Sequence, residues 1–302
     1  MPRPLYGAIE AGGTKFLCAA GYGPNEVLEE VRFPTSSPSA TLGSVVSFFE
    51  RIEREVGPLG SFGIAAFGPL DLQPRSRTFG HLLATPKSGW AGTDLLAPLK
   101  ERFARPIAID TDVNAAALAE AHFGAGFGTR SLAYVTVGTG IGGGAVIDGR
   151  TLRGLLHPEM GHIHVRRDPR DEGFVGVCPI HRDCLEGLAS GPAIAVRWGA
   201  TVDEWPEGHP GLEIIGDYLG QLAALIALLL SCERIVFGGG VMTTGRLMPH
   251  VRTAACRYLN GYLPLESVAF DEYICAPGLA ERAGITGAFV LATEAARRLS
   301  IE

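Results

Sequence analysis

The stretch LHPEMGHIHVRRDPRDEGFVGVCPIHRDCLEGLASGP (residues 156–192) concentrates potential metal ligands in one segment. They are Cys178, His181 and Cys184 in the pattern C-x-x-H-x-x-C, preceded by His162 and His164. Two thiolates and two imidazoles form a ligand set suited to tetrahedral zinc, and the thiolates neutralise the ion. Free cysteines also occur as small buried side chains, but this segment is charged and rich in glycine. The pattern therefore predicts a zinc site, with either His162 or His164 as the fourth ligand.

Two carboxylates, Glu159 and Glu186, flank these ligands in the sequence. The segment has little apolar content, and ordering each of its residues costs roughly 1–2 kcal/mol. A structural zinc can offset that cost and hold nearby carboxylates in one geometry. We therefore expect the metal to position other groups, so the reactive chemistry must come from elsewhere in the chain.

Length and composition limit the class of protein. A chain of 302 residues, 46% hydrophobic and 19% charged, can form two globular lobes. The net charge of −6 argues against nucleic acid as a partner. The first residues do not resemble a signal peptide, and the longest apolar run, residues 222–230, is too short to span a bilayer. Isolated cysteines favour reduced thiols, so we expect a cytoplasmic protein without a membrane partner.

A strand–turn–strand hairpin is predicted near the N-terminus. Apolar residues 5–9 and 16–21 flank the sequence EAGGTK, residues 10–15. Glycines in such a turn let backbone N–H groups approach an anion, and the threonine and lysine suit a phosphate. An ordinary turn would have the same composition, and the sequence matches neither a Walker loop nor a dinucleotide fingerprint.

The same design recurs further along the chain. A predicted strand at residues 131–137 leads through GTGIGGG, residues 138–144, into a strand at 145–147. A third strand ends in the glycines of residues 238–240, after a long apolar helix at residues 212–232. Recurring glycine turns predict a duplicated α/β fold with two lobes and a nucleotide between them.

A polar motif, DTDVN at residues 110–114, follows a predicted strand at 107–109 and begins an alanine-rich helix ending near residue 123. Side chains at the carboxyl ends of such strands face the ligand crevice in open α/β sheets. Capping also favours Asp and Asn, but it needs only one of them, so Asp112 and Asn114 are functional candidates.

Further helices are predicted at residues 39–56 and 93–103. In the irregular region between them, Lys87 and Trp90 line either a polar pocket or a solvated loop.

These motifs, in this order, resemble the ROK family of sugar kinases and repressors, in the actin–hexokinase superfamily, over essentially the whole chain. The resemblance implies a two-lobed actin/hexokinase-like (ribonuclease H-like) α/β fold with the active site in the interlobe cleft. We expect a smaller lobe of residues 1–118, completed by a C-terminal helix at about 285–302, and a larger lobe of residues 119–284 containing the zinc loop 157–186.

The resemblance also implies ATP- and Mg²⁺-dependent phosphoryl transfer to a hexose, with Asp112 as the general base, and a homodimer. It assigns ATP binding to Gly12, Gly13, Thr14, Lys15, Thr139, Gly140, Pro192, Gly238, Gly239 and Gly240. It assigns sugar binding to Asn114, Glu159, His162, Glu186, Gly68 and Thr111, and Zn²⁺ binding to His162, Cys178, His181 and Cys184. It thus selects His162 for both metal and sugar and leaves His164 as a bystander.

Four features resemble the fructokinase branch of the family: Glu10, Thr111, the sequence TPKSGW at residues 85–90, and the C-x-x-H-x-x-C spacing. They predict D-fructose as substrate and fructose 6-phosphate as product, with a mannose or glucose kinase as the alternative. A non-catalytic sugar sensor is a further alternative. A ROK-type repressor would need a DNA-binding helix-turn-helix before the phosphate turn, which here begins at residue 10.

Overall fold

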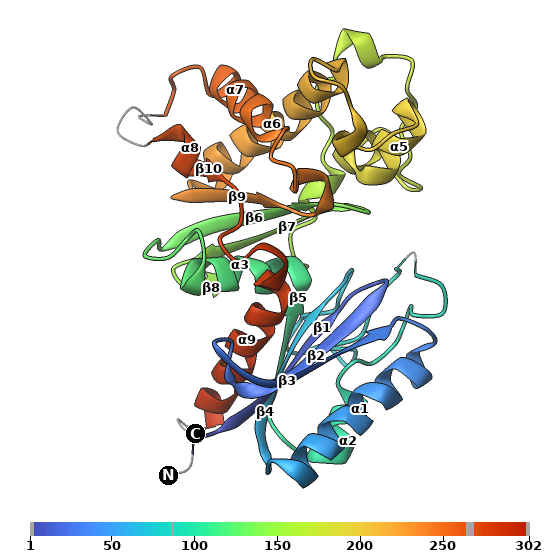
Figure 1. The fold of residues 1–302 in the computed structure, drawn as a ribbon, viewed down its shortest axis with the longest axis vertical. Helices are drawn as coiled ribbons and strands as arrows, with labels where there is room; N and C mark the ends of the chain where they lie inside the picture. Colours follow the sequence, from blue (N-terminus) through green and yellow to red (C-terminus); the bar gives the residue numbers. More distant parts are fainter. Residues whose placement is uncertain (1–2, 86, 264–268, 300–302) are drawn as a thin grey trace. The chain divides into compact units, whose positions relative to one another are not determined.

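The computed structural model describes residues 3–85, 87–263 and 269–299, and it divides into two compact α/β units (Figure 1). Unit 1 comprises Met1–Ala119, Thr151–His157 and Arg282–Glu302. Unit 2 comprises Glu120–Arg150 and Pro158–Glu281. We expected Thr151–His157 in the second lobe, but in the structure this segment belongs to unit 1. There Arg153 bonds to Asp110 at the end of a strand, and His157 bonds to Leu70 in a loop. The predicted two-lobed α/β fold class is confirmed.

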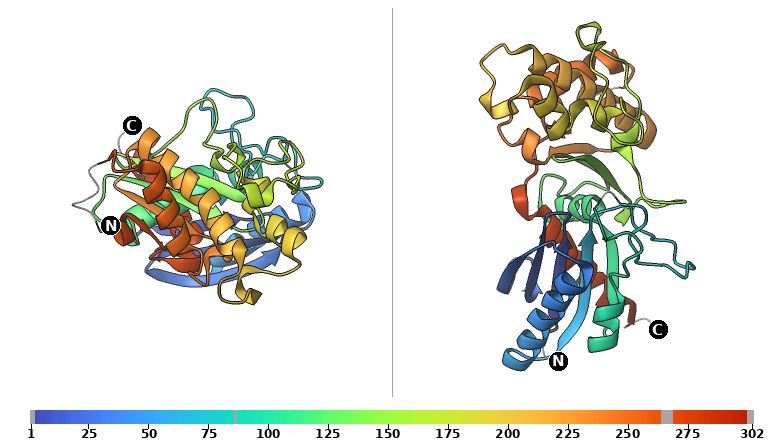
Figure 2. Two further views of the ribbon diagram at one scale, coloured as in Figure 1. Left: turned by 90° about the horizontal axis from the view of Figure 1, so that it is seen from above. Right: turned by 90° about the vertical axis from the view of Figure 1, so that its right-hand side faces the viewer.

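Unit 1 is built on a five-stranded sheet of order β3-β2-β1-β4-β5. Its strands are β1 (Leu5–Ala11), β2 (Lys15–Gly23), β3 (Glu26–Pro34), β4 (Leu59–Ala66) and β5 (Ile107–Thr111). Its helices are α1 (Pro38–Glu55), α2 (Ala97–Phe103), the first part of α3 (Asp112–Phe123) and α9 (Ala283–Leu299). Helices α1 and α2 cover one face of the sheet and α9 covers the other (Figures 1 and 2).

Unit 2 contains a second five-stranded sheet, of order β10-β9-β6-β7-β8. The strands of this sheet are β6 (Ser131–Val137), β7 (Ile141–Ile147), β8 (Arg150–Thr151, of which Thr151 is counted in unit 1), β9 (Arg234–Gly238) and β10 (Ile274–Cys275). Its helices are α4 (Leu185–Ala189), α5 (Gly191–Trp198), α6 (Pro210–Leu230), α7 (Met248–Leu259) and α8 (Phe270–Tyr273). Helices α6 and α7 pack along each other beside this sheet.

The two sheets repeat one pattern. In unit 1, β1 pairs antiparallel with β2 and parallel with β4, which pairs parallel with β5. In unit 2, β6 pairs antiparallel with β7 and parallel with β9, which pairs parallel with β10. In both sheets a glycine turn joins the two antiparallel strands, as the sequence predicts.

Three elements differ from the expectations. Strand β3 was not predicted, because Glu29 interrupts its apolar positions Val27, Val31 and Phe33, of which Val31 and Phe33 pack against the core. Helix α2 begins at Ala97 and not at Thr93, since Asp94 Oδ1 accepts the N–H groups of Leu96 and Ala97 and holds the chain before the helix. The glycine turn after β6 is shorter than predicted because β7 begins at Ile141.

Trp90 lies in the core of unit 1 and lines no pocket. It is fully buried, its ring packs against Phe16 and Phe67, and its Nε1 donates to the carbonyl of Ser36 at 2.8 Å. Lys87 is partly exposed, and Pro86, in the same loop, lies outside the described residues. Burying an aromatic ring of this size contributes about 1.5–3 kcal/mol or more, so the tryptophan anchors the loop to the sheet.

Helix α6 is long and apolar enough to cross a membrane by length and composition, with a mean hydropathy of 1.6. Its uninterrupted apolar run, residues 222–230, is too short to indicate such a span, but the whole helix is long enough. In the structure, however, 72% of its most apolar window is buried inside the protein. It is therefore the core helix that the sequence predicts.

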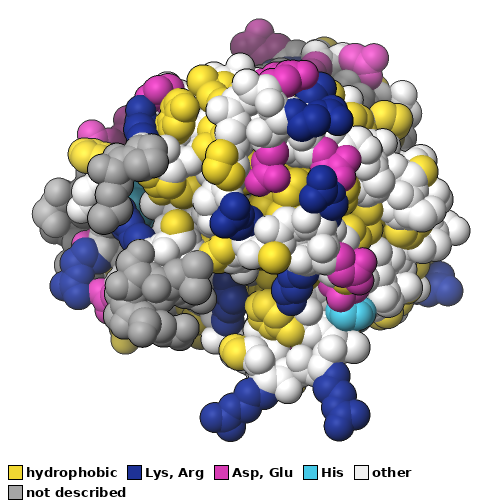
Figure 3. All heavy atoms as spheres, turned by 90° about the horizontal axis from the view of Figure 1, so that it is seen from below, with side chains coloured by type: hydrophobic (Ala, Val, Ile, Leu, Met, Phe, Trp, Pro, Cys, Tyr) yellow, Lys and Arg dark blue, Asp and Glu magenta, His cyan; other side chains and the backbone are white. Residues whose placement is uncertain are grey.

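Charges on one face of the molecule are mixed. Figure 3 shows Lys and Arg side chains interspersed with Asp and Glu, and neither sign forms a continuous patch among the described residues of that face. A nucleic-acid surface usually presents a basic stripe, and this face does not.

Candidate functional site: a metal cluster and a carboxylate at a strand end

Four potential metal ligands of unit 2 lie together. One ligand atom from each of His162, Cys178, His181 and Cys184 lies within 4.8 Å of the other three. His162 Nδ1 is 3.6 Å from Cys184 Sγ and 3.8 Å from Cys178 Sγ. His181 Nδ1 is 3.9 Å from Cys178 Sγ.

These separations suit zinc. Bond lengths of about 2.3 Å to sulfur and 2.0–2.1 Å to nitrogen put the two ligand atoms about 3.6 Å apart in a tetrahedron. The observed sulfur–nitrogen distances of 3.6, 3.8 and 3.9 Å are close to this value. The other histidine considered, His164, is 68% exposed, and its Nδ1 lies 3.8 Å from Asp183. The geometry therefore favours His162 as the fourth ligand.

A tight turn of the backbone places three of these ligands. Cys178 and Arg182 exchange backbone hydrogen bonds of 3.3 and 3.0 Å, and the His181 N–H donates to Cys178 Sγ at 3.4 Å. Arg182 has a positive φ of 57°, and a Cβ on Gly187 would lie 1.8 Å from its carbonyl oxygen. Glycine is therefore required at position 187 for the turn to rest on α4, which begins directly after Cys184.

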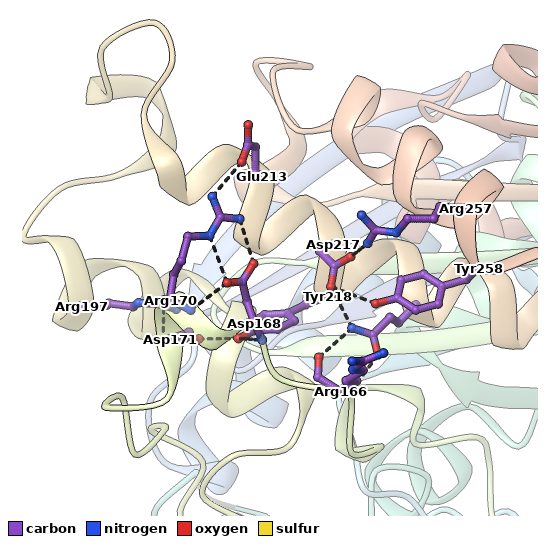
Figure 4. A network of polar contacts seen from close by, with 11 residues as sticks. Arg166, Asp168, Arg170, Asp171, Arg197, Glu213, Asp217, Tyr218, Arg257 and Tyr258 are labelled. Carbon is purple, nitrogen blue, oxygen red and sulfur yellow. Dashed lines mark hydrogen bonds and ion pairs between the residues drawn. The ribbon is translucent and has the colours of Figure 1, made fainter.

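The loop after His162 is fixed by polar contacts with α6, seen in Figure 4. Gln221 accepts the Arg166 N–H at 2.7 Å and donates to the Arg166 carbonyl at 2.8 Å. Tyr218 donates to the buried Asp171 at 2.6 Å, and Arg197 pairs with the same carboxylate. This network therefore helps to order the loop, in addition to any metal. The amino-acid composition of the loop did not indicate these contacts.

The two predicted sugar-binding carboxylates of unit 2 are near each other. Glu159 immediately precedes a 3-10 helix, Met160–His162, and Glu186 lies in the first turn of α4. Glu186 Oε2 accepts the Ile141 N–H at 3.0 Å, and a Cβ on Gly140 would lie 2.6 Å from that oxygen. Burial, and next the negative charge of Glu186, raise the pKa of Glu159 to about 7. Near neutral pH, Glu159 can therefore donate a hydrogen bond as well as accept one.

The glycine turns of unit 2 form one exposed backbone region. The Gly191 N–H, at the start of α5, donates to the Gly138 carbonyl at 2.8 Å. A Cβ on Gly138 would lie 3.9 Å from the Gly240 nitrogen. Thr139, Pro192 and Gly240 are exposed there. By contrast Gly238 is buried against Tyr134, and Gly239 has a φ of +90° beside the Val137 backbone, so these two glycines serve packing.

In unit 1 the turn between β1 and β2 presents an open backbone. The Gly12 N–H donates to the Lys15 carbonyl at 3.0 Å, and Thr35 Oγ1 donates to the Gly12 carbonyl at 2.7 Å. A Cβ on Gly13 would meet nothing within 4 Å, and Thr14 and Lys15 are exposed. This is the arrangement expected of a phosphate-binding turn.

Asp112 is the first residue of α3, directly after β5, and its Oδ1 accepts the Val113 N–H at 2.8 Å. Thr111 performs the capping role, since its Oγ1 accepts the Asn114 N–H at 3.2 Å. Thr111 and Asn114 are 2% and 0% exposed, and Asn114 Nδ2 donates to the buried Asp110 at 2.9 Å. Their burial argues against the expected direct contacts with a sugar, and both are instead bonded to Asp110 on either side of Asp112 in the sequence.

A second carboxylate of unit 1, Glu10 at the end of β1, lies near Asp112. Burial first, and the negative charge of Asp112 second, raise the pKa of Glu10 to about 7. A Cβ on Gly284 would lie 2.5 Å from its carboxyl carbon, so Glu10 packs against the start of α9. Gly68, at the end of β4, similarly leaves room for His157: a Cβ there would lie 3.3 Å from the ring.

Two residues near these groups were missed. Arg153 donates to Asp110, and His157 Nε2 accepts the Leu70 N–H at 3.1 Å. Neither belongs to a motif, and both depend on contacts between segments more than forty residues apart, so no local signal in the sequence indicated them.

Known proteins of one family resemble this chain over nearly its whole length. The model of the ROK family matches residues 6–295. The chain belongs to the ROK family. It is 46% identical to a fructokinase of Zymomonas mobilis, over 97% of this chain and 98% of the relative, and 40% identical to a fructokinase of Streptococcus mutans, over 97% and 99%.

The fold comparison agrees with this membership. A ROK hexokinase from Thermus thermophilus has a TM-score of 0.79 at 27% identity, covering 97% of this chain and 99% of that one. The actin/hexokinase-like fold implied by the ROK resemblance is therefore confirmed.

Proposed function

We propose that this chain catalyses ATP-dependent phosphorylation of D-fructose at its primary hydroxyl, giving fructose 6-phosphate. The observation that carries the proposal is the 46% identity to a fructokinase over nearly the whole of both chains. A carboxylate at the start of α3 and exposed glycine turns in both units supply the groups that this reaction needs.

Asp112 is proposed as the general base. The transition state of phosphoryl transfer is loose, so the protein contributes chiefly by positioning and by stabilising charge. A carboxylate within reach of the sugar hydroxyl accepts its proton as the bond to phosphorus forms. The cap provided by Thr111 and the bond from the Val113 N–H fix the backbone from which Asp112 projects.

Glu159, Glu186, His162 and Gly68 are proposed to bind the sugar. The carboxylates accept hydrogen bonds from hydroxyl groups, and Glu159, with a pKa of about 7, can also donate one. The Ile141 N–H holds one oxygen of Glu186 in place. Thr111 and Asn114, which are buried, are proposed to hold the chain on either side of Asp112.

The turns at Gly12, Gly13, Thr139, Gly140 and Gly240, with Thr14, Lys15 and Pro192, are proposed to bind ATP; all of these residues are at least partly exposed. N–H groups in such turns bind phosphate oxygens, and the lysine adds a positive charge. Gly238 and Gly239 shape this region through packing. Mg²⁺ bound with ATP would neutralise charge on the phosphates.

Zinc is proposed at His162, Cys178, His181 and Cys184, in a structural role. When bound, the ion would fix the turn that begins at Cys178, and with it the start of α4 that carries Glu186. A metal on Nδ1 of His162 leaves Nε2 able to donate to a sugar hydroxyl, and the metal fixes that tautomer.

We expect fructose to be the best substrate in a coupled ATP-consumption assay with fructose, mannose, glucose and N-acetylated sugars. The reason is similarity to fructokinases along the whole chain. The measurement is kcat/KM for each sugar at saturating ATP. A higher kcat/KM for glucose than for fructose would overturn the choice of sugar, and no turnover with any hexose would favour a non-catalytic sensor.

We expect His162→Ala to lose zinc and to raise the KM for fructose, whereas His164→Ala changes neither. His162 Nδ1 lies among the sulfur ligands, while His164 is 68% exposed beside Asp183. Elemental analysis and fructose kinetics on the two variants provide the test, and His164→Ala serves as the matched control. Loss of metal from the His164 variant, with retention in the His162 variant, would reverse the assignment.

We further propose a homodimer acting in the cytoplasm. None of the six cysteines, all of which lie among the described residues, forms a disulfide, which suits a reducing compartment. The dimer rests on the family resemblance, and light scattering coupled to size-exclusion chromatography measures it directly.

A further inference from the structure

Hydrogen bonds at three points fix the segment Thr151–His157 to the rest of unit 1. The Gln73 side-chain amide donates to the carbonyls of Gly154 and Leu155, at 2.6 and 2.7 Å. His157 Nε2 accepts the Leu70 N–H at 3.1 Å. The third point is Arg153, whose Nε and Nη2 both donate to Asp110 Oδ2, at 3.1 and 2.5 Å. The contacts of Gln73 and His157 therefore hold the segment that carries Arg153 in place beside Asp110.

Asp110 distributes its hydrogen bonds between Arg153 and the motif that contains Asp112. Its Oδ2 faces the guanidinium, while its Oδ1 accepts the Thr111 N–H at 2.8 Å and Asn114 Nδ2 at 2.9 Å. These two donors stand on either side of Asp112 in the sequence. The Asp110 carboxylate therefore holds the end of β5 and the first turn of α3 together around Asp112.

Asp110 is buried and paired with Arg153. Its side chain is 0% exposed, whereas that of Arg153 is 33% exposed. Removing the cation leaves a buried carboxylate without its partner, which is strongly unfavourable. The Asp110 carboxylate is then no longer held in the position from which it fixes Thr111 and Asn114.

We propose that Arg153 is a positioning residue for Asp112, acting through Asp110. The inference rests on the proposed role of Asp112 as base in fructose phosphorylation. The contacts of Arg153 are to Asp110, Ile109 and Thr151, none of which is proposed to bind a reactant or the metal. It fixes the junction of β5 and α3, and so the direction in which the base projects.

The test is kcat for fructose phosphorylation by Arg153→Ala, expressed per active site counted by calorimetric titration with a nucleotide analogue, so that unfolded protein is excluded. We expect kcat to fall on the order of 10–100-fold, because a small misplacement of a reacting group is costly. The KM for ATP should change little. Arg153→Lys should lose less, since an ammonium keeps the charge but not the paired contact.

Chemical rescue separates positioning from general destabilisation. Because Arg153 is one-third exposed, guanidinium ions at low millimolar concentration should enter the space left in Arg153→Ala and restore kcat, whereas methylammonium restores less. The double variant Asp110→Asn/Arg153→Ala should be no slower than the slower single variant, as expected of residues acting as a unit. Arg150→Ala, an exposed residue three positions earlier, is the matched control and should match wild type.

Wild-type kcat in Arg153→Ala would overturn the inference, as would a loss that guanidinium does not restore. A wild-type protein with no hexose kinase activity would overturn the proposed function and this inference together. If the wild-type protein phosphorylates fructose and Arg153→Ala has the same kcat, only the inference about Arg153 would be overturned. If Arg153→Ala does not fold, Arg153→Lys carries the same kcat comparison.

Discussion

Replacing Asp112 by Asn is expected to lower kcat for fructose by about 10²–10⁴-fold, the usual contribution of a general base. An amide cannot accept the proton of the sugar hydroxyl. It can still accept the Val113 N–H that Asp112 Oδ1 now accepts at 2.8 Å, so the start of α3 should be preserved. The KM for fructose should therefore remain close to that of wild type.

The melting temperature tells this effect apart from misfolding. Asp112 is one of the charges that raise the pKa of Glu10, so its neutralisation removes a repulsion and should leave the melting temperature unchanged or higher. Asp148→Asn is the matched control, because Asp148 is exposed in a turn with a φ of 50°, which Asn tolerates. Near-normal turnover in Asp112→Asn would exclude this residue as the base.

Replacing Cys178 or Cys184 by Ser is expected to release zinc, lower the melting temperature and raise the KM for fructose. A hydroxyl is a poor zinc ligand at neutral pH, and three remaining ligands do not close the tetrahedron. Each kcal/mol of metal binding that is lost should lower the melting temperature by about 2–4 °C in a chain of this size. The KM should rise because Glu186 lies two residues after Cys184, at the start of α4.

Cys256→Ser is the control, since Cys256 is an exposed free thiol of α7 outside the cluster. It should keep its zinc and its kinetic constants. Elemental analysis of wild-type protein purified without chelators is the decisive first measurement. A zinc content near zero would remove the structural role of the metal. The polar contacts of Tyr218 and Gln221 would then hold the loop without it.

Much of the fold was predictable because its signals are local. Apolar strands next to glycine turns identified β1, β2, β6 and β9, and helical spacing identified α1 and α6. Strand β3 was missed because Glu29 interrupts the short apolar pattern of its inner face, where Val31 and Phe33 pack against the core. The tryptophan at position 90 was ambiguous, because its burial depends on Phe16 and Phe67, which are distant in sequence.

The candidate site was predictable in its residue types but less in its geometry. The spacing of Cys178, His181 and Cys184 fixed a turn, whereas the choice between His162 and His164 needed the direction of each ring. The burial of Asn114 could not be predicted either, because it depends on the packing of α3 against the sheet and on Asp110. Arg153 is found only when the segment Thr151–His157 is seen to lie in unit 1.

The repeated order of the two sheets bears on how such an enzyme acquires new substrates. Each repeat retains its hairpin and two parallel strands, and each hairpin carries one of the proposed phosphate turns. The residues proposed to recognise the sugar in unit 2 lie in a long insertion between β8 and β9, outside the repeated strands. With the proposed roles, substitutions in that insertion can alter which sugar is accepted while the two hairpin turns stay unchanged. Selection can thus diversify substrate choice without rebuilding the machinery for phosphoryl transfer.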